Sequence, residues 1–121
     1  MIDHIEIYTA RMADSLRFYA TALAPLGYVQ KVDSLAKGFG NGDALDLFLV
    51  EGEPSKLHFA FTAPDRATVD RIYAGARAAR LTLDRAPALA PHIHPDYYAG
   101  YLRDPDGRLI EFVSHRPEPR C

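Results

Sequence analysis

The sequence of 121 residues contains a single cysteine, no long apolar run and no cluster of basic residues. Because Cys121 has no second cysteine to pair with, we expect no internal disulfide and a reducing, cytoplasmic environment. No apolar stretch approaches the roughly 20 residues that a membrane-spanning helix needs. The first residues, MIDHIEIY, have the pattern of a strand rather than of a signal peptide. A net charge of -2 without a basic run gives no support for a nucleic-acid partner.

Apolar residues make up 48% of the chain and charged residues 25%, which is typical of a folded protein with a real core. The length fits one domain over residues 1–121. Alternating and helical periodicities then divide the chain into elements. We expect helices at 12–26 and 66–79, and strands at 2–8, 28–32, 36–40, 44–50, 57–62, 81–84, 98–104 and 109–114.

The order of these elements is β-α-β-β-β, and it occurs twice, in modules of about 1–52 and 56–115. His4 and His58 both come early in the first strand of a module, 54 positions apart. Asp46 and Glu111 end similar segments, GDALD and GRLIE, 65 positions apart. The larger second offset places extra residues in the second module, within 86–98 (APALAPHIHPDYY), and such an insertion is a candidate functional loop. The prediction is an α+β fold in which two βαβββ modules form a cup-shaped mixed sheet with the helices outside.

Side chains alternate across a strand, so His4, His58 and Glu111 are predicted to share the face of the sheet that the helices do not cover. Two imidazoles and one carboxylate are a common ligand set for Zn, Mn, Fe, Co or Ni as divalent ions, and three protein ligands leave positions open. Each residue alone has a simpler explanation, since a histidine or glutamate on a strand is usually hydrogen-bonded or exposed. Asp46 is a candidate fourth ligand or proton-transferring group, or an exposed strand residue.

The loop around HIHPDYY supplies the best candidates for substrate binding, because imidazole and phenol groups donate hydrogen bonds and stack on planar ligands. The candidates are His92, His94, Tyr97 and Tyr98, together with Arg103 for an anionic group. The alternatives are tyrosines that only pack the rim of the cup and a surface salt bridge for Arg103. His92 and His94 alternate, so at most one is expected to face the cup. His115, beyond the last strand, is expected at the surface.

Three segments of the sequence resemble the vicinal-oxygen-chelate superfamily, the glyoxalase, bleomycin-resistance and extradiol-dioxygenase group. They are IDHIEIYTARMADSLRFYATALAPLGY, LHFAFTAPDRATVDRIYAGA and HPDYYAGYLRDPDGRLIEFVSH, and the DPDG–IEF ending with an upstream H–F–F strand is the most specific part. The resemblance implies paired βαβββ modules, often a homodimer, and metal-ligand positions at His4, His58 and Glu111. It also implies a fourth ligand at Asp46 in glyoxalase-I-like members, where the usual residue is the longer Glu.

From the resemblance we expect a metal-dependent enzyme that acts on a small oxygenated molecule, of lyase or isomerase type, with Glu111 and Asp46 as catalytic carboxylates. A metal with open positions polarises two substrate oxygens, and a neighbouring carboxylate moves a proton. The alternative is a metal-free protein that sequesters an aromatic drug or metabolite in the same cup. Fold alone does not choose between them.

Overall fold

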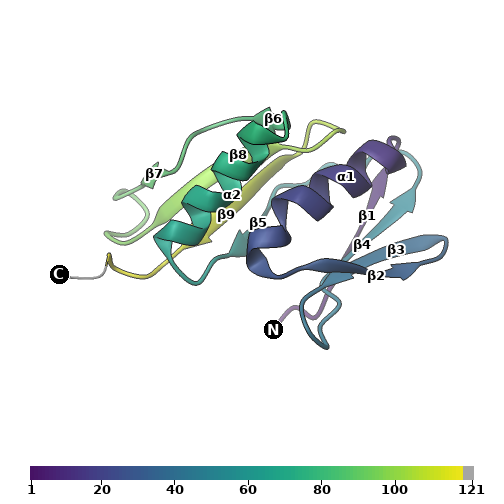
Figure 1. Ribbon diagram of the computed structural model, residues 1–121, viewed down its shortest axis with the longest axis horizontal. Coiled ribbons are helices and arrows are strands. Elements are labelled where there is room, and N and C mark those ends of the chain that lie inside the picture. Colours follow the sequence, from purple (N-terminus) through teal and green to yellow (C-terminus); the bar gives the residue numbers. More distant parts are fainter. Residues whose placement is uncertain (119–121) are drawn as a thin grey trace.

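The computed structural model describes residues 1–118, which form two consecutive β-α-β-β-β units (Figure 1). The first unit consists of β1 (Ile5–Thr9), α1 (Met12–Ala22), the 3-10 turn η1 (Ala24–Leu26), β2 (Val29–Asp33), β3 (Ala36–Gly40) and β4 (Leu47–Glu51). The second consists of β5 (Phe59–Thr62), α2 (Arg66–Ala78), β6 (Thr82–Leu83), β7 (Ala88–Leu89), β8 (Tyr98–Arg103) and β9 (Leu109–Ser114). The predicted α+β class and the repeated element order are confirmed.

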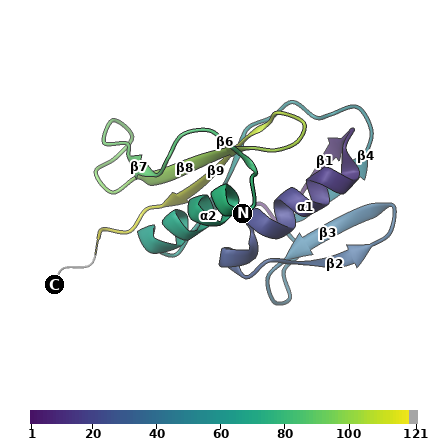
Figure 2. The same cartoon turned by 45° about the horizontal axis from the view of Figure 1, so that its top comes forward.

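Each unit forms its own mixed sheet, with strand orders β1-β4-β3-β2 and β5-β9-β8-β6, and β7 adds to β8. In both sheets the first strand of the unit runs parallel to the last, and the other pairs are antiparallel. Within residues 1–118 no strand of one sheet pairs with a strand of the other. Both helices lie on one side of the sheets, with α2 over β8 and β9 and α1 beside α2 (Figures 1 and 2). One face of each sheet is therefore left uncovered by helices.

Two differences from the predicted boundaries have local causes. The α-helix that was predicted to reach residue 26 ends at Ala22 and continues as the 3-10 turn, because Pro25 has no amide hydrogen for an α-helical bond. Strands β1 and β5 begin later than predicted, since their pairing with β4 and β9 starts only at Ile5 and Phe59. His4 and His58 therefore each stand one residue before a strand, and the prediction that they lie within it is wrong.

The apolar core is one continuous cluster to which both units contribute. The first sheet supplies Ile7, Leu47 and Leu49, and the second supplies Ile110 and Phe112, all almost fully buried. The helices bury residues spaced three or four apart, namely Phe18, Tyr19, Ala22, Val69, Ile72 and Ala76. This spacing is that of one helix face. The core thus uses the face of each sheet that the helices cover, and leaves the opposite faces for other contacts.

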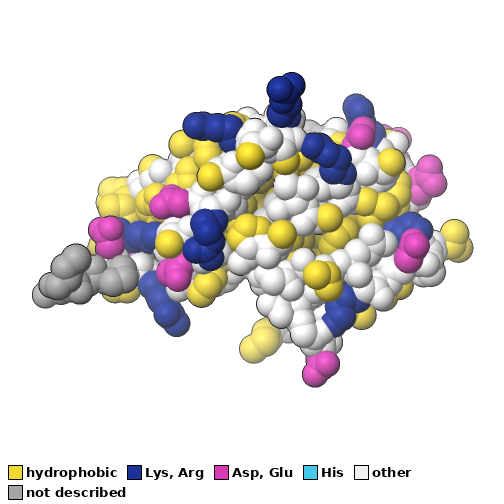
Figure 3. Space-filling view, in the orientation of Figure 1, with side chains coloured by type: hydrophobic (Ala, Val, Ile, Leu, Met, Phe, Trp, Pro, Cys, Tyr) yellow, Lys and Arg dark blue, Asp and Glu magenta, His cyan; other side chains and the backbone are white. Residues whose placement is uncertain are grey.

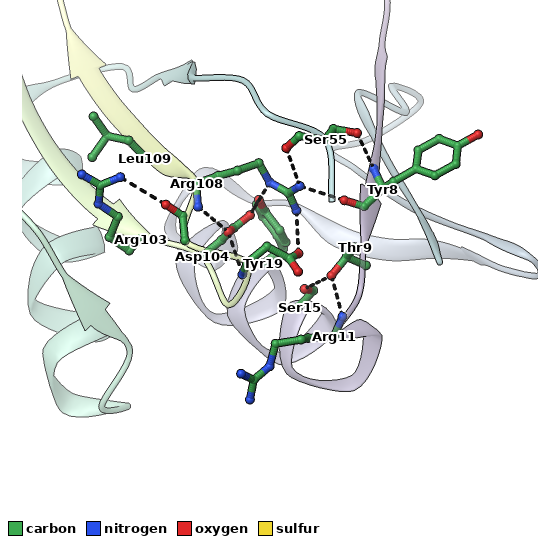
Figure 4. A network of polar contacts seen from close by, with 12 residues as sticks. Tyr8, Thr9, Arg11, Ser15, Tyr19, Ser55, Arg103, Asp104, Arg108 and Leu109 are labelled. Atoms are coloured by element: carbon green, nitrogen blue, oxygen red, sulfur yellow. Dashed lines mark hydrogen bonds and ion pairs between the residues drawn. The ribbon is translucent and has the colours of Figure 1, made fainter. Parts of the chain in front are cut away.

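A buried polar network at the turn between β8 and β9 joins the two units (Figure 4). The Asp104 carboxylate accepts hydrogen bonds from the Tyr19 hydroxyl of α1 at 2.6 Å and from Arg108 Nε at 2.7 Å. Arg108 Nη1 also donates to the carbonyl oxygens of Tyr8, at 2.7 Å, and Ser55, at 3.0 Å. The Asp104 and Arg108 side chains are only 0% and 4% exposed. Because its partners come from both units and their connector, the network fixes how the units sit together.

The predicted hairpin at Asp104–Gly107 is confirmed, and Gly107 has the positive φ of 87° that favours glycine. The amide of Gly107 donates to the carbonyl of Asp104 at 2.8 Å, which closes the turn. The burial of Asp104 and Arg108 was not predicted, since residues of a turn are usually exposed. In residues 1–118 neither helix has the length and apolar character to cross a bilayer.

Candidate functional site

His58 and Glu111 meet on the helix-free face of the second sheet. Phe61 of β5 points into the core, so its neighbours Ala60 and Thr62 point the other way. Glu111 stands directly opposite Ala60 in β9, and His58 lies two residues before Ala60 on the same side. In the view of the helix-covered face in Figure 3 no histidine side chain is visible. The predicted common face of His58 and Glu111 thus follows from the strand register.

The hydrogen bonds of His58 leave one ring nitrogen directed at Glu111. Nδ1 lies 2.8 Å from the carbonyl oxygen of Leu109, and a carbonyl only accepts, so Nδ1 carries the hydrogen. In the neutral ring Nε2 then holds a lone pair, yet it lies 3.0 Å from Oε1 of Glu111, another acceptor. Two acceptors at this distance need a proton or a cation between them.

This pair fits a divalent metal. Ligand nitrogen and oxygen atoms lie about 2.0–2.2 Å from zinc, so two neighbouring ligands of one ion lie about 3.0–3.5 Å apart, the shorter value for octahedral and the longer for tetrahedral geometry. Metal-binding histidines almost always donate their second ring hydrogen to a carbonyl or carboxylate, as Nδ1 of His58 does to Leu109. The donor set and its orientation therefore suit two positions of a metal site.

The second oxygen of Glu111 is also engaged. The hydroxyl of Tyr97 donates to Oε2, and Tyr101 stands opposite Glu111 in β8. Burial, and next the hydrogen bond to Glu111, raise the pKa of Tyr97, and burial and the Glu111 charge raise that of Tyr101. Both phenols thus stay protonated and neutral beside the carboxylate, whose side chain is only 6% exposed. Glu111 is held in one orientation by groups from two other segments.

His4 stands at the equivalent place of the first unit but has different neighbours. Its ring packs edge-on against Phe48 with the centroids 5.4 Å apart, and its Nδ1 lies 2.7 Å from the exposed Asp3 carboxylate. Within residues 1–118 no three His, Cys, Asp or Glu side chains are grouped closely enough to hold one metal ion. A single chain therefore brings together His58 and Glu111 but does not add His4 to them.

The strand register corrects the predicted equivalence of Asp46 and Glu111. Glu6 pairs with Phe48 as Ala60 pairs with Glu111, so the residue equivalent to Glu111 is Phe48. The resemblance of GDALD to GRLIE misled by two positions, because Gly42 precedes the strand partner of Ile5, Leu47, by five residues, whereas Gly107 precedes the strand partner of Phe59, Ile110, by three. Asp46 accepts a hydrogen bond from the hydroxyl of Tyr28, whose pKa is raised by burial and by this bond.

The two histidines border different hollows of the surface. His4 and Asp46 line an open hollow of about 480 Å³ whose other wall is β5 from Phe59 to Thr62. His58 lines another of about 460 Å³, together with Arg103 and Leu109. A four-residue strand is about 13 Å long at 3.3 Å per residue, and His58 precedes its start. The two histidines therefore border different hollows, and His4 is not grouped with His58 and Glu111.

The two histidines of the predicted binding loop lie in different places, His94 in a cluster around Tyr97 and His92 at a separate hollow. The centre of the His94 ring lies 5.4 Å from that of the Tyr97 ring, in an edge-on arrangement, and Nε2 of His94 lies 2.8 Å from Nδ1 of His115. The ring of Tyr97, whose hydroxyl donates to Glu111, therefore packs against two imidazoles. His115, although exposed, belongs to this cluster, which the sequence did not indicate. His92 lines a separate hollow with Tyr101.

Tyr98 and Arg103 are engaged in structural contacts. Tyr98 points to the helix side, where its hydroxyl donates to Asp70 of α2 at 2.6 Å. Burial, and next this bond, raise the pKa of Tyr98 to about 12. Arg103 Nε donates to Asp84 at 3.0 Å, while its side chain also borders the hollow beside His58. Tyr98 is therefore separated from the candidate site, and Arg103 lies at its edge.

Sequence reasoning missed two residues on the same face, Tyr101 and Arg85. Tyr101 is directly opposite Glu111, and the Arg85 guanidinium carbon lies 3.9 Å from the centre of the Tyr101 ring. Alternation along the strand at 98–104 would have placed Tyr101, Ala99 and Arg103 on one face. The approach of Arg85 depends on how the residues after β6 run along β8, which no sequence pattern indicates.

Comparisons with known proteins agree with this fold. The family model of the Glyoxalase/Bleomycin resistance protein/Dioxygenase superfamily matches residues 1–112. No curated protein gives a significant match. Similar solved structures include a glyoxalase/bleomycin resistance protein from Albidiferax ferrireducens T118, with 21% identity, a TM-score of 0.76, and coverage of 95% of this chain and 98% of that one. A lactoylglutathione lyase from Agrobacterium tumefaciens has 22% identity, a TM-score of 0.71, and coverage of 94% and 92%. At these identities the likeness establishes the fold alone.

Proposed function

Because this chain belongs to the Glyoxalase/Bleomycin resistance protein/Dioxygenase superfamily, we propose that it is a metal-dependent enzyme of lyase or isomerase type that acts on a small oxygenated molecule. The observation that carries the proposal is the pair of His58 Nε2 and Glu111 Oε1, two acceptors 3.0 Å apart on an uncovered sheet face. A proton on His58 Nε2 would make the pair an ion pair, and in this proposal a divalent metal takes the place of that proton.

In this proposal His58 and Glu111 supply two ligands, and His4 of a second copy supplies the third. The first strands β1 and β5 lie at edges of their sheets, and exposed edges favour association. A two-fold symmetric homodimer would make two such composite sites, each with the first unit of one copy facing the second unit of the other. Light scattering that shows a strict monomer in the presence of bound metal would rule out this arrangement.

A bound divalent ion of Zn, Mn, Fe, Co or Ni would supply Lewis-acid polarisation of two neighbouring substrate oxygens. Glu111 keeps its orientation through the hydroxyl of Tyr97, and His58 keeps its lone pair through the carbonyl of Leu109. Asp46, beside His4, is the candidate group for moving a proton on the substrate. His92, His94, Tyr97 and Arg103 are proposed to border the substrate. The cytoplasmic location expected from the lone cysteine remains a prediction.

A metal-free protein that sequesters an aromatic drug or metabolite is the second candidate. It is favoured by Phe48, which places an aromatic ring where the second unit has its carboxylate. The exposed phenol of Tyr8 lies on the same face, two residues from Glu6. This candidate predicts binding of planar ligands to protein that has been stripped of metal.

Calorimetric titration of chelator-treated protein, purified without a His-tag, with Zn²⁺, Mn²⁺, Fe²⁺, Co²⁺ and Ni²⁺ tests the proposal. We expect binding of at least one ion, and its loss in His58→Ala and Glu111→Gln. His92→Ala is the matched control, since it removes a histidine of the neighbouring hollow. Absence of binding for all five ions would leave the sequestration function as the better account.

A further inference from the structure

Arg85 lies on the same face as Glu111, where its backbone pairs with Tyr101 and its side chain stacks on the Tyr101 ring. Its backbone carbonyl accepts the amide of Tyr101 at 2.9 Å, so the chain after β6 follows β8. The central carbon of its guanidinium lies over the Tyr101 ring, 3.9 Å from the ring centre. An arginine stacked on an aromatic ring loses less conformational freedom on binding a ligand than a free one.

The hydrogen-bonding edge of this guanidinium is open. Its one ion-pair partner within 4.0 Å among residues 1–118 is Asp84, whose Oδ1 lies 3.5 Å from Nε, a distance too long for a normal hydrogen bond. The other oxygen of Asp84 is bound by Arg103 at 3.0 Å. Two arginines thus share one carboxylate, which leaves a local excess of one positive charge in a chain of net charge -2. The Arg85 side chain is 65% exposed, so an incoming anion can reach it.

The position of Arg85 relates it to the candidate metal pair. Glu111, Tyr101 and Arg85 come from three neighbouring chain segments, and their side chains form a row across the sheet. Arg85 and Tyr101 also line a hollow of about 390 Å³. Its other wall is the loop that extends the second unit, with the apolar side chains of Leu89 and Ile93. The row therefore runs from Glu111, at the candidate metal pair, to the cationic Arg85, beside which lie the apolar side chains of Leu89 and Ile93.

We propose that Arg85 binds an anionic group of the ligand, a carboxylate or a phosphorus oxyanion, and selects small molecules that carry such a group beside an apolar segment. A planar guanidinium edge binds these groups through two parallel hydrogen bonds. The apolar segment lies against Leu89 and Ile93. The assignment of the reacting end to Glu111 rests on the proposed function, whereas anion binding at Arg85 requires no metal.

Binding to chelator-treated protein tests this proposal independently of activity. The probes are phenylphosphonate, benzoate and the neutral benzamide, followed by NMR titration of the backbone amides. The variant is Arg85→Gln. Arg77→Gln is the matched control, because Arg77 also stacks on a tyrosine, with its guanidinium carbon 5.6 Å from the Tyr73 ring centre on α2. Asp84→Asn removes the competing carboxylate.

We expect one or both anions to bind about tenfold more tightly than benzamide, with shifts at Tyr101 and Leu89. Arg85→Gln should abolish this preference, Arg77→Gln should keep it, and Asp84→Asn should strengthen it. A preference for phenylphosphonate over benzoate identifies a phosphorus oxyanion, and the reverse a carboxylate. Equal binding of the charged and neutral probes, or equal losses in the Arg85 and Arg77 variants, would overturn the proposal. Anion binding that persists without any metal affinity would retain it while refuting the metal-dependent enzyme.

Discussion

Each unit has a histidine just before its first strand, His4 before β1 and His58 before β5, but the two histidines have different neighbours. In the second unit His58 faces Glu111, and tyrosines and a backbone carbonyl hold both side chains in place. In the first unit His4 faces Phe48 and forms its polar contact with the exposed Asp3. The strand pairing is equivalent in the two units, so the difference arises from side chains and not from the fold.

This comparison indicates a division of roles between the two halves of a duplicated fold. A fixed pair of ligands needs supporting hydrogen bonds, which His58 and Glu111 have with the Leu109 carbonyl and the Tyr97 hydroxyl, whereas Nδ1 of His4 is supported by the exposed Asp3. The first unit contributes His4, whose ring packs on Phe48 and whose Nδ1 lies beside the exposed Asp3. Three protein ligands of this kind leave more than one coordination position open for a substrate, whereas a carboxylate in place of Phe48 would fill one.

The largest effect is expected where the two units are joined. Asp104→Ala removes the acceptor of the Tyr19 hydroxyl and one of the two carboxylates paired with the buried Arg108, the other being Asp106 at 2.9 Å, and we expect a loss of about 3 kcal/mol in the free energy of unfolding. Urea denaturation measures it. Asp14→Ala, which removes the partner of Arg11 in an exposed pair on α1, should cost less than about 1 kcal/mol. Equal losses in the two variants would show that the network does not hold the units together.

Removing one support of Glu111 should weaken metal binding while sparing the fold. Tyr97→Phe deletes the hydroxyl that donates to Oε2, and we expect metal affinity to fall about 10–100-fold. Calorimetry provides the measurement. Tyr98→Phe is the control, since that hydroxyl binds Asp70 on the helix side. The account of Glu111 fails if the two variants bind metal equally well.

Phe48→Glu would make the first unit resemble the second. The new carboxylate would stand beside His4 at the position equivalent to Glu111, so metal affinity should rise about tenfold through a fourth ligand, a gain near 1.4 kcal/mol. Calorimetry and metal analysis measure the change. Val50→Glu, on the same strand and face but farther from His4, should leave the affinity unchanged. A rise in both variants would indicate only a general effect of negative charge.

The smallest effect concerns alkaline stability. The pKa of Tyr98 is raised to about 12 in the fold and lies near 10 in an unfolded chain, so folding favours the protonated phenol. The stabilisation is fully present below pH 10 and is lost as the pH rises toward 12. Between about pH 10 and pH 12 the unfolding temperature of Tyr98→Phe should therefore fall less than that of the wild-type protein. An equal fall of the unfolding temperature in Tyr98→Phe and in the wild-type protein would contradict this contribution of Tyr98.

Much of the fold followed from the sequence because its signals are local. Asp65 caps α2 through the Thr68 amide at 2.8 Å, and the strands at 36–40 and 109–114 have their predicted bounds. Alternation also placed His58 and Glu111 on one face. These predictions needed only periodicity and capping chemistry, which a short window of sequence contains.

The site was less predictable because it depends on register and on contacts between distant segments. The matching of Asp46 with Glu111 failed, since similar letters do not reveal loop length before a strand. The buried pair of Asp104 and Arg108 gives no sequence signal different from that of an ordinary turn. The sequence left open whether the two modules pair within one chain or between two chains, and this decides where His4 meets the other two ligands.

The most direct test of the composite site mixes two inactive variants. His4→Ala and Glu111→Gln each remove a different ligand, so neither protein alone should bind the metal tightly. If each site combines two copies, unfolding and refolding an equal mixture should restore about a quarter of the wild-type metal capacity, because half of the dimers would contain one intact site. No recovery of metal capacity in the mixture, from a wild-type protein that binds metal, would contradict a site shared between two copies.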